Sequence, residues 1–241
     1  MNIISIIGLG LFLGLKHATD ADHVIAVSTI VSKQKNIFHA TLVGIAWGVG
    51  HTIMLIAIGM MIILFHVSIP SSLQNIFELF VAMLLIVLGI LTLSGILPTL
   101  IRKLSKKPLS HKHIHLHGQP HMHTHMHSFL NSHGAFHLLR PFFVGIVHGL
   151  AGSGAVTLLL LSSISDQRLA IMYLAIFGIG TIVGMMSITT LIAIPFVFSQ
   201  SKFYKLDRVF TWIAGIVSIL YGVYYGLRLI SGPSPSFPIG I

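Results

Sequence analysis

Residues 14–24 read GLKHATDADHV and place one lysine, two histidines and two carboxylates between strongly apolar segments. MNIISIIGLGLFL precedes this stretch and VIAVSTIV ends the same segment. Across the 241 residues, 54% are hydrophobic and 8% are charged, and the mean hydropathy is +0.93. Such values are typical of a chain that is dissolved in lipid rather than in water. The sequence therefore predicts an integral membrane protein with polar groups inside its first span.

Six apolar segments are each long enough for the roughly 20 residues that a spanning helix needs. They cover about residues 3–31, 41–65, 75–100, 138–162, 169–198 and 209–230. Because lipid leaves no partner for free backbone groups, and the segments do not alternate in polarity, we expect helices rather than barrel strands. The start MNIISIIG lacks a basic region and no convincing cleavage site follows it, so we expect a retained helix rather than a signal peptide.

The basic residues predict how the spans are oriented. Most of them fall on one side: Lys33, Lys35, Arg102, Lys103, Lys106, Lys107, Lys112, Arg140, Lys202, Lys205 and Arg208. By the positive-inside rule this side is cytoplasmic, whereas Arg168 and Arg228 lie near the other surface. We expect a multi-pass protein of the cell membrane with loop 101–137 in the cytoplasm and both termini outside. The net charge of +9 then reflects topology and not a nucleic-acid partner.

The two halves of the chain resemble each other. GLKHATDADHVIAVSTIVS in the first span resembles GIVHGLAGSGAVTLLLLSS in the fourth, and AWGVGHTIML in the second resembles IFGIGTIVGM in the fifth. Three spans per half is an odd number, so the halves must cross the membrane in opposite directions, as in secondary transporters. We expect an all-α fold of two inverted three-helix repeats, residues 1–100 and 138–231, joined by the loop 101–137 and followed by the tail 232–241.

Asp20 and Asp22 are two of only five acidic residues in the chain. A charged side chain near the bilayer centre costs about 2.5–3.5 kcal/mol on insertion scales, so both need compensation. A divalent cation would balance them, and His17 and His23 would add nitrogen donors that suit Ni²⁺, Co²⁺, Zn²⁺ or Cu²⁺. The chain has no cysteine, which excludes thiolate ligands. The alternative is an internal network in which Lys16 and the histidines neutralise the carboxylates.

The spacing leaves open which aspartate is the ligand. On a regular helix His17, Asp20 and His23 fall within an arc of roughly 120°, whereas Asp22 points elsewhere. Asp22 joins them only if the helix is broken, and a single helix over 3–31 would be about 43 Å long, more than the roughly 30 Å apolar core. HGLAGSGA in the fourth span has three glycines and is a second candidate break.

HATDADH fits the H-x4-D-H signature of the nickel/cobalt transporter family, and LGLKHATDADHVIAV resembles that family's second-helix motif. WGVGHT is similar to the Gly-His segment of the family's next conserved helix. The resemblance implies transport of Ni²⁺ or Co²⁺, with His17, Asp22, His23 and His51 as binding residues. Longer family members have eight spans with the signature in the second, so the resemblance does not fix orientation or direction.

Two further histidines have open roles. His51 is either a ligand, as the resemblance implies, or a core histidine bonded to a carbonyl. His148 matches His17 in the second half but has no neighbouring carboxylate, so it is either a ligand or a helix-packing donor.

The loop sequence HKHIHLHGQPHMHTHMH contains two runs in which histidine alternates with another residue. An extended run would place its imidazoles on one face, where they could share borderline metals with little selectivity. We expect metal buffering, with a merely solvated linker as the alternative. The histidines concerned are His111, His113, His115, His117, His121, His123, His125 and His127.

Two other functions compete with transport. AGSGA around Ser153 resembles the Gly-x-Ser-Gly of a rhomboid-type membrane protease, but that chemistry needs a base histidine on a later helix and none follows His148. We therefore expect no enzyme and no prosthetic group. A metal sensor, or an accessory protein for a metalloenzyme such as urease, stays open. No Walker motif is present, so a gradient or a partner must drive transport; a second copy or a metallochaperone would be the protein partner.

Overall fold

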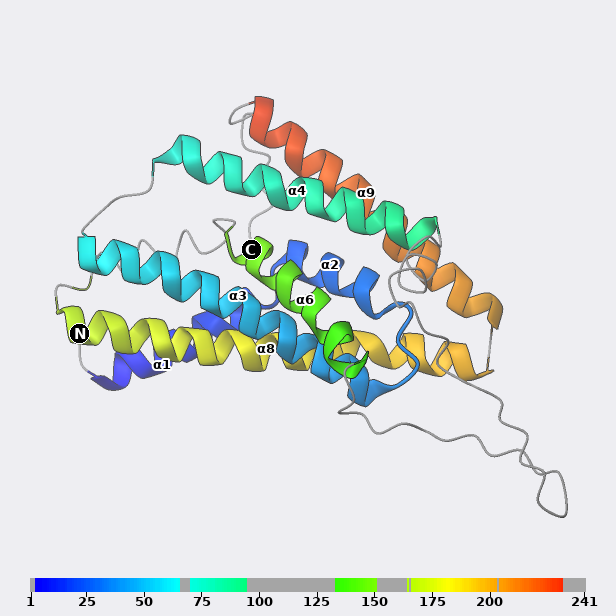
Figure 1. Cartoon of the computed structure of the whole chain (residues 1–241), viewed down its shortest axis with the longest axis horizontal. Coiled ribbons are helices and arrows are strands. Elements are labelled where there is room, and N and C mark those ends of the chain that lie inside the picture. Colours follow the sequence, from blue (N-terminus) through cyan, green and yellow to red (C-terminus); the bar gives the residue numbers. More distant parts are fainter. Residues whose placement is uncertain are drawn as a thin grey trace, which may run out of the picture.

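The computed structural model describes residues 3–65, 70–94, 133–150, 164, 166–202 and 204–231. These residues form helices and no strand, as the sequence predicts (Figure 1). The helices are α1 (Ile3–His17), α2 (Ala21–Val31), α3 (Ile37–Phe65), α4 (Ser71–Leu93), α6 (His133–Gly149), α8 (Gln167–Lys202) and α9 (Tyr204–Ser231). Helices α3, α4, α8 and α9 are each long and apolar enough to cross a membrane, and α1 with α2 forms a fifth, bent candidate.

The first span is broken inside the polar motif. Helix α1 ends at His17 and α2 begins at Ala21, with an angle of 54° between them. The backbone N–H of Thr19 donates to the carbonyl of Lys16 in a tight turn, and Asp20 adopts an extended conformation with ψ of 145°. As expected from the helical spacing, Asp22 can reach the same centre as His17 only because the helix is broken here.

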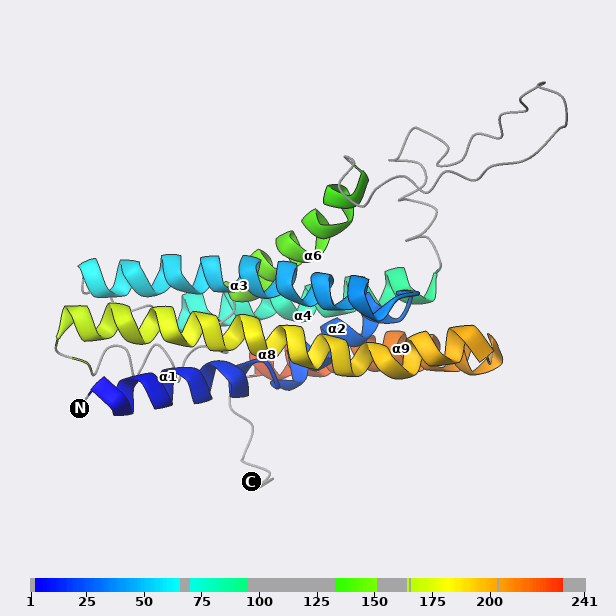
Figure 2. The ribbon, with the colours of Figure 1, turned by 90° about the horizontal axis from the view of Figure 1, so that it is seen from below.

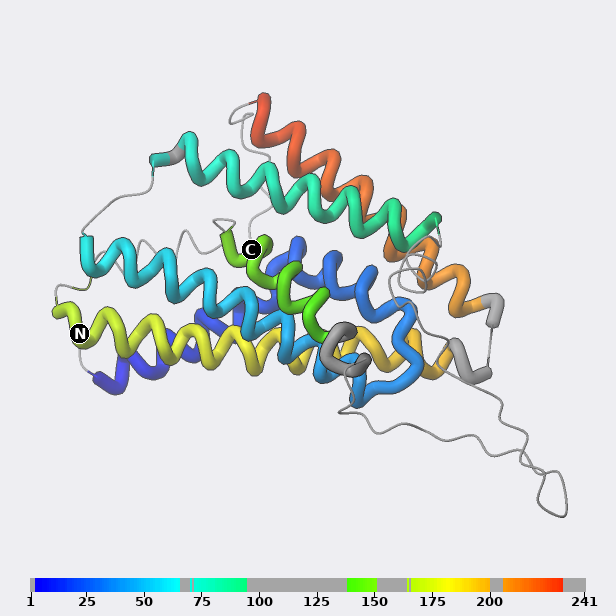
Figure 3. Tube along the Cα trace, in the orientation of Figure 1, coloured from blue at the N-terminus to red at the C-terminus, as the bar shows by residue number. Residues whose placement is uncertain are grey.

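Two antiparallel helix pairs form the frame of the molecule. Helix α3 packs against α8, and α4 packs against α9; the colours along the tube in Figure 3 show the opposite directions within each pair. The other extensive helix–helix contacts join α1 to α8 and α6 to α3. In Figure 2 the α1, α8 and α3 helices form successive layers, and α6 lies against α3.

Glycines allow the closest of these approaches. An added Cβ at Gly14 of α1 would overlap the carbonyl oxygen of Phe177 and approach the backbone nitrogen of Thr181 on α8. An added Cβ at Gly145 of α6 would overlap the carbonyl oxygen of Trp47 on α3 and approach the backbone nitrogen of His51. The short helices α1 and α6 are therefore held in backbone contact with the long helices.

Helix α2 lies between the α4–α9 pair and α8, which it also contacts (Figure 1). Its buried side chains Ala26, Val27 and Val31 belong to a core cluster with Val81 and Leu85 of α4. At its far end the Nζ atom of Lys33 donates to the carbonyl of Thr92, 3.1 Å away, at the end of α4. These contacts fix the position of the half-helix that carries Asp22 and His23.

The fourth predicted span is described only in part. Helix α6 ends at Gly149, its apolar part covers Leu138–Gly149, and residues 151–163 lie outside the described residues. The predicted break in HGLAGSGA and Ser153 fall there. The loop histidines His111–His127 also lie outside the described residues, as does the tail 232–241.

Candidate metal centre

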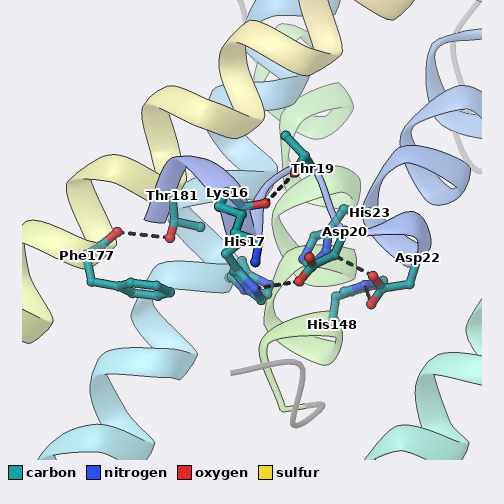
Figure 4. A network of polar contacts seen from close by, with 10 residues as sticks. Lys16, His17, Thr19, Asp20, Asp22, His23, His148, Phe177 and Thr181 are labelled. Atoms are coloured by element: carbon teal, nitrogen blue, oxygen red, sulfur yellow. Dashed lines mark hydrogen bonds and ion pairs between the residues drawn. The ribbon is translucent and has the colours of Figure 1, made fainter. Parts of the chain in front are cut away.

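Four histidines and one aspartate from four helices meet at the break in the first span. His17 ends α1, Asp22 and His23 lie in the first turn of α2, and Figure 4 shows them beside His148 of α6. His51 of α3 completes the group. Their exposed fractions are 5% for His17, 7% for Asp22, 1% for His23 and zero for His51 and His148. The centre is thus closed to solvent, and the structure brings together the residues that the sequence singled out.

His17 connects an aspartate to a second histidine. Its Nδ1 atom lies 3.0 Å from Oδ2 of Asp20, and its Nε2 atom lies 2.9 Å from Nε2 of His51. An ionised carboxylate only accepts hydrogen bonds, so Nδ1 of His17 carries the proton and Nε2 has a free lone pair. His51 then donates from Nε2, which leaves its own Nδ1 atom without a proton.

Asp22 bridges two further histidines. Its Oδ1 atom accepts from Nδ1 of His23 at 3.2 Å, and its Oδ2 atom accepts from Nε2 of His148 at 2.9 Å. The second contact joins residues 126 positions apart and ties α2 to α6. Both histidines use their proton toward the carboxylate, so the opposite ring nitrogen of each presents a lone pair.

The nitrogen atoms left over by these hydrogen bonds are buried and have no hydrogen-bond partner among the residues that the structure describes: His23 Nε2, His51 Nδ1 and His148 Nδ1. Burying a polar atom without a partner is costly, and native proteins satisfy most such atoms. Bare imidazole nitrogens are electron-pair donors, so a cation satisfies them where a further N–H donor is missing. The arrangement is therefore suited to hold a transition-metal ion.

Two overlapping sets of donor atoms fit a metal ion. His17, His23 and His51 form one, and Asp22, His23 and His148 form the other, with the donor atoms of each set within 4.8 Å of one another. His23 belongs to both. Three imidazoles with a carboxylate nearby suit Ni²⁺, Co²⁺, Zn²⁺ or Cu²⁺ better than Mg²⁺ or Ca²⁺, which prefer oxygen.

The break gives the two aspartates different surroundings. The side chain of Asp22 is 10% exposed and faces two ring nitrogens of the centre, whereas that of Asp20 is 37% exposed and contacts the outer nitrogen of His17. A carboxylate on the outer nitrogen of a metal-ligating histidine commonly fixes its tautomer and orientation. The geometry thus favours Asp22 inside the centre and Asp20 behind His17.

Two aromatic rings lie beside the centre that the sequence pattern did not single out. The ring centroid of Trp47 lies 5.7 Å from those of both His23 and His148, and the Phe177 ring lies 5.7 Å from that of His17. Trp47 is fully buried. The repeat alignment contained a signal for both, because it pairs Trp47 with Phe177, one residue before matched glycines.

Comparison with known proteins decides the family. The sequence profile of the NicO family, described as high-affinity nickel-transport protein, matches residues 3–223. The chain belongs to the NicO family. Membership of this family agrees with the resemblance seen in HATDADH. The family gives the protein the function of metal-ion transport across a membrane.

A curated relative of this NicO protein is the "Urease accessory protein UreH" of Bacillus sp. (strain TB-90). The two chains are 36% identical over 229 residues, which is 95% of this chain and 93% of the relative. No solved structure matches the chain.

Proposed function

We propose that this NicO protein carries Ni²⁺ or Co²⁺ through the membrane by way of a buried centre of His17, Asp22, His23 and His51. The observation that carries the proposal is the pair of overlapping buried sets, His17 with His23 and His51, and Asp22 with His23 and His148, whose donor atoms lie within 4.8 Å of one another in each set. His148, which is held by its hydrogen bond to Asp22, supplies a further metal-donor atom. Asp20 positions His17 through its hydrogen bond to that ring.

One distance in the centre supports a shared metal ligand role for His17 and His51. Imidazole nitrogens bind ions such as Zn²⁺ at about 2.0–2.1 Å, so two ligands at a right angle lie about 3 Å apart. The Nε2 atoms of His17 and His51 lie 2.9 Å apart. A metal ion would replace the proton that these atoms now share, with little movement of either ring.

Charge supports a divalent ion. Asp20 and Asp22 carry two negative charges at a position where Lys16 can offset only one of them. A divalent cation neutralises both. Imidazole and carboxylate ligands accept Ni²⁺, Co²⁺, Zn²⁺ and Cu²⁺, and the geometry of the site and the availability of each metal decide among them. Membership of a nickel-transport family favours Ni²⁺ among these.

Packing at glycines supports two inverted repeats. Aligning His17 with His148 pairs Gly14 with Gly145, and aligning the second span with the fifth pairs Gly50 with Gly180. Gly14 approaches Phe177 and Thr181 just as Gly145 approaches their counterparts, Trp47 and His51; likewise Gly50 approaches Phe142 O and Gly180 approaches Leu11 O. Contacts that exchange in this way are expected of a pseudo-two-fold axis.

We infer six spans on this basis, with α6 and the residues after it as the fourth. The repeats would comprise residues 1–100 and 138–231. Lys33, Lys35 and Arg140 lie at the same end of the helix assembly as the start of α3, in keeping with a cytoplasmic loop 101–137 and outer termini.

A closed centre implies alternating access. The ligands are buried, so the ion can enter or leave only when helices move. The bond from His148 to Asp22 links the second repeat to the first, so relative motion of the repeats would open one side at a time. The loop histidines would buffer the ion at the cytoplasmic surface.

The test is ⁶³Ni flux in sealed proteoliposomes. Wild type should accumulate nickel, His17→Ala should lose most of the flux, and His39→Ala should keep it, because His39 lies in the first turn of α3, away from the centre. Equal flux in wild type and His17→Ala would refute the site.

A second candidate is a non-transporting accessory or sensor protein. The name of the curated relative, a urease accessory protein, favours it. The two functions are compatible if the accessory role is to supply the metal. Nickel binding without any flux in wild-type proteoliposomes would leave only the accessory or sensor function.

A further inference from the structure

His23 is the residue that the two overlapping sets of donors share. One set joins it to His17 and His51, and the other joins it to Asp22 and His148. The ring centroid of His23 lies 4.7 Å from that of His17 and 5.0 Å from that of His51. It lies only 4.5 Å from the ring centroid of His148. A single imidazole thus borders both sets.

The contacts of Asp22 are short enough for an ion position of their own. Its Oδ1 atom lies 3.2 Å from Nδ1 of His23, and its Oδ2 atom lies 2.9 Å from Nε2 of His148 (Figure 4). Ligands at about 2.0–2.1 Å from an ion and at a right angle are about 3 Å apart. An ion in the second set would therefore replace the two protons in these contacts, as it would between His17 and His51 in the first.

His23 can serve only one of the two sets at a time. A neutral imidazole has one N–H group and one lone pair. When Nδ1 of His23 donates to Asp22, only Nε2 is left to bind an ion in the first set. To bind an ion in the second set through Nδ1, the ring must carry its proton on Nε2. That atom and Nδ1 of His148 have no partner within the described part of the chain, so each can accept the proton that its own ring gives up.

Charge also limits the centre to one ion. Two divalent ions would bring four positive charges, whereas Asp20 and Asp22 supply two negative charges. His17, His23, His51 and His148 are buried, and uncompensated charge is costly in such surroundings. The two sets are therefore alternative positions and not a two-metal site.

The two sets have matched surroundings in the two halves of the chain. The repeat alignment pairs His17 with His148 and Phe177 with Trp47. The Phe177 ring lies 5.7 Å from that of His17, and the Trp47 ring lies 5.7 Å from that of His148. One set thus borders the contact of α1 with α8, and the other borders the contact of α6 with α3. Equivalent surroundings are expected of two positions that a pseudo-two-fold axis relates.

One ligand breaks this equivalence. The alignment pairs His51 with Thr181, and the hydroxyl of Thr181 donates to the carbonyl of Phe177 at 2.9 Å. The second half therefore offers no imidazole at this place, and the carboxylate of Asp22 completes the second set instead. The two sets thus differ in chemistry, with three imidazoles in one and two imidazoles with a carboxylate in the other.

We propose that the centre holds one ion in two alternative positions and that the ion passes between them during transport. The first position is His17, His23 and His51, and the second is Asp22, His23 and His148. This inference rests on the proposed transport function. The first position uses only α1, α2 and α3, whereas the second also needs α6 of the other repeat. Motion of one repeat against the other therefore changes which position the ion occupies.

Anomalous scattering at the nickel edge locates the ion in variants that each lack one position. In His148→Ala the peak should stay in the first position. In His51→Ala it should move to Asp22, His23 and His148. Thermal unfolding without nickel shows whether each variant is folded. A peak that stays beside His17 in His51→Ala, or no peak at the centre of the folded variant, would overturn the proposal.

Cobalt gives a readout in solution that depends on neither crystals nor flux. The visible absorption of bound Co²⁺ responds to the type and geometry of its ligands. With less than one equivalent of Co²⁺ per chain, His148→Ala should keep the wild-type spectrum and His51→Ala should shift it. His39→Ala is the matched control, because His39 lies in the first turn of α3, away from the centre. The same spectrum in His51→Ala and His148→Ala would contradict two positions.

Flux shows whether transport needs the second position. His148→Ala should still bind nickel in the first position, but its initial ⁶³Ni flux at saturating nickel should fall at least about 10-fold, because the ion cannot pass on. His39→Ala should keep the wild-type flux. Wild-type flux in His148→Ala would refute the passage. Absence of flux in wild type would instead refute the transport function, while the peaks in the two variants would still decide whether the centre has two positions.

Discussion

The Nε2 atom of His148 lies 2.9 Å from the Oδ2 atom of Asp22, although 126 residues separate them. This bond joins the end of α6, which the repeat alignment matches to α1, to the first turn of α2. It gives the second half of the chain a direct part in a centre that otherwise belongs to the first half.

Substitution of His148 should therefore weaken metal binding. His148→Ala removes a buried donor and leaves Oδ2 of Asp22 unpaired, and we expect the nickel affinity of the centre to fall about 10- to 100-fold. The dissociation constant, measured by quenching of Trp47 fluorescence, checks this. An affinity equal to that of wild type would make His148 only a helix-packing residue.

The two aspartates should differ in their effect. Asp22→Asn removes a charge and an acceptor shared by two histidines, so we expect more than about a 100-fold loss of nickel affinity. Asp20→Asn removes only the acceptor behind His17, and a loss of about 10-fold is expected. Equilibrium nickel binding to both variants shows which loss of affinity is larger. A larger loss for Asp20→Asn would place Asp20, and not Asp22, inside the centre.

The buried tryptophan should sense which ion is bound. Trp212, the other tryptophan, is 53% exposed and can be replaced by phenylalanine. Paramagnetic Ni²⁺ or Co²⁺ in the centre should quench the fluorescence of Trp47, whereas Zn²⁺ should bind without comparable quenching and compete with Ni²⁺. In the same background, His23→Ala should abolish the quenching. Persistent quenching in that variant would place the ion elsewhere.

Matched glycines should be equally intolerant of a side chain. Gly14→Ala and Gly145→Ala place a methyl group against the backbone of α8 and α3, and each should lower the stability in detergent by about 1–3 kcal/mol. Gly8→Ala is the control, because its added Cβ meets nothing within 4 Å. Thermal unfolding of the three variants is the measurement. Wild-type stability in Gly145→Ala alone would argue against equivalent packing in the two repeats.

Removing the loop histidines should separate buffering from transport. Deletion of residues 111–127 takes away eight histidines and should reduce the total nickel bound per chain, while Trp47 quenching and the flux pathway persist. Equilibrium dialysis and ⁶³Ni flux on the same preparation make the comparison. Complete loss of flux would show that the loop is part of the pathway.

Much of the centre follows from local chemistry in the sequence. The cost of charge in lipid singled out Asp20 and Asp22, and the family signature pointed to His17, Asp22, His23 and His51. Which aspartate turns inward could not be derived, because it depends on three residues at the break, whose turn is set by packing of α1 against α8 and of α2 against α4 and α9.

Contacts between distant helices were the other limit. The approach of His148 to Asp22 and the position of Phe177 beside His17 both join helices far apart in the chain. Periodicity predicts which face of a helix is apolar but not which helix covers it. The repeat alignment came closest, since it pairs Gly14 with Gly145 and Trp47 with Phe177 before any packing is known.

The most direct measurement is anomalous scattering at the nickel absorption edge from the nickel-loaded protein. The account predicts a peak enclosed by His17, His23 and His51, with the Nε2 atoms of His17 and His23 about 2.1 Å from the ion and Asp22 in contact. A transport-competent preparation in which no peak occurs there, and nickel lies only at other residues, would contradict it.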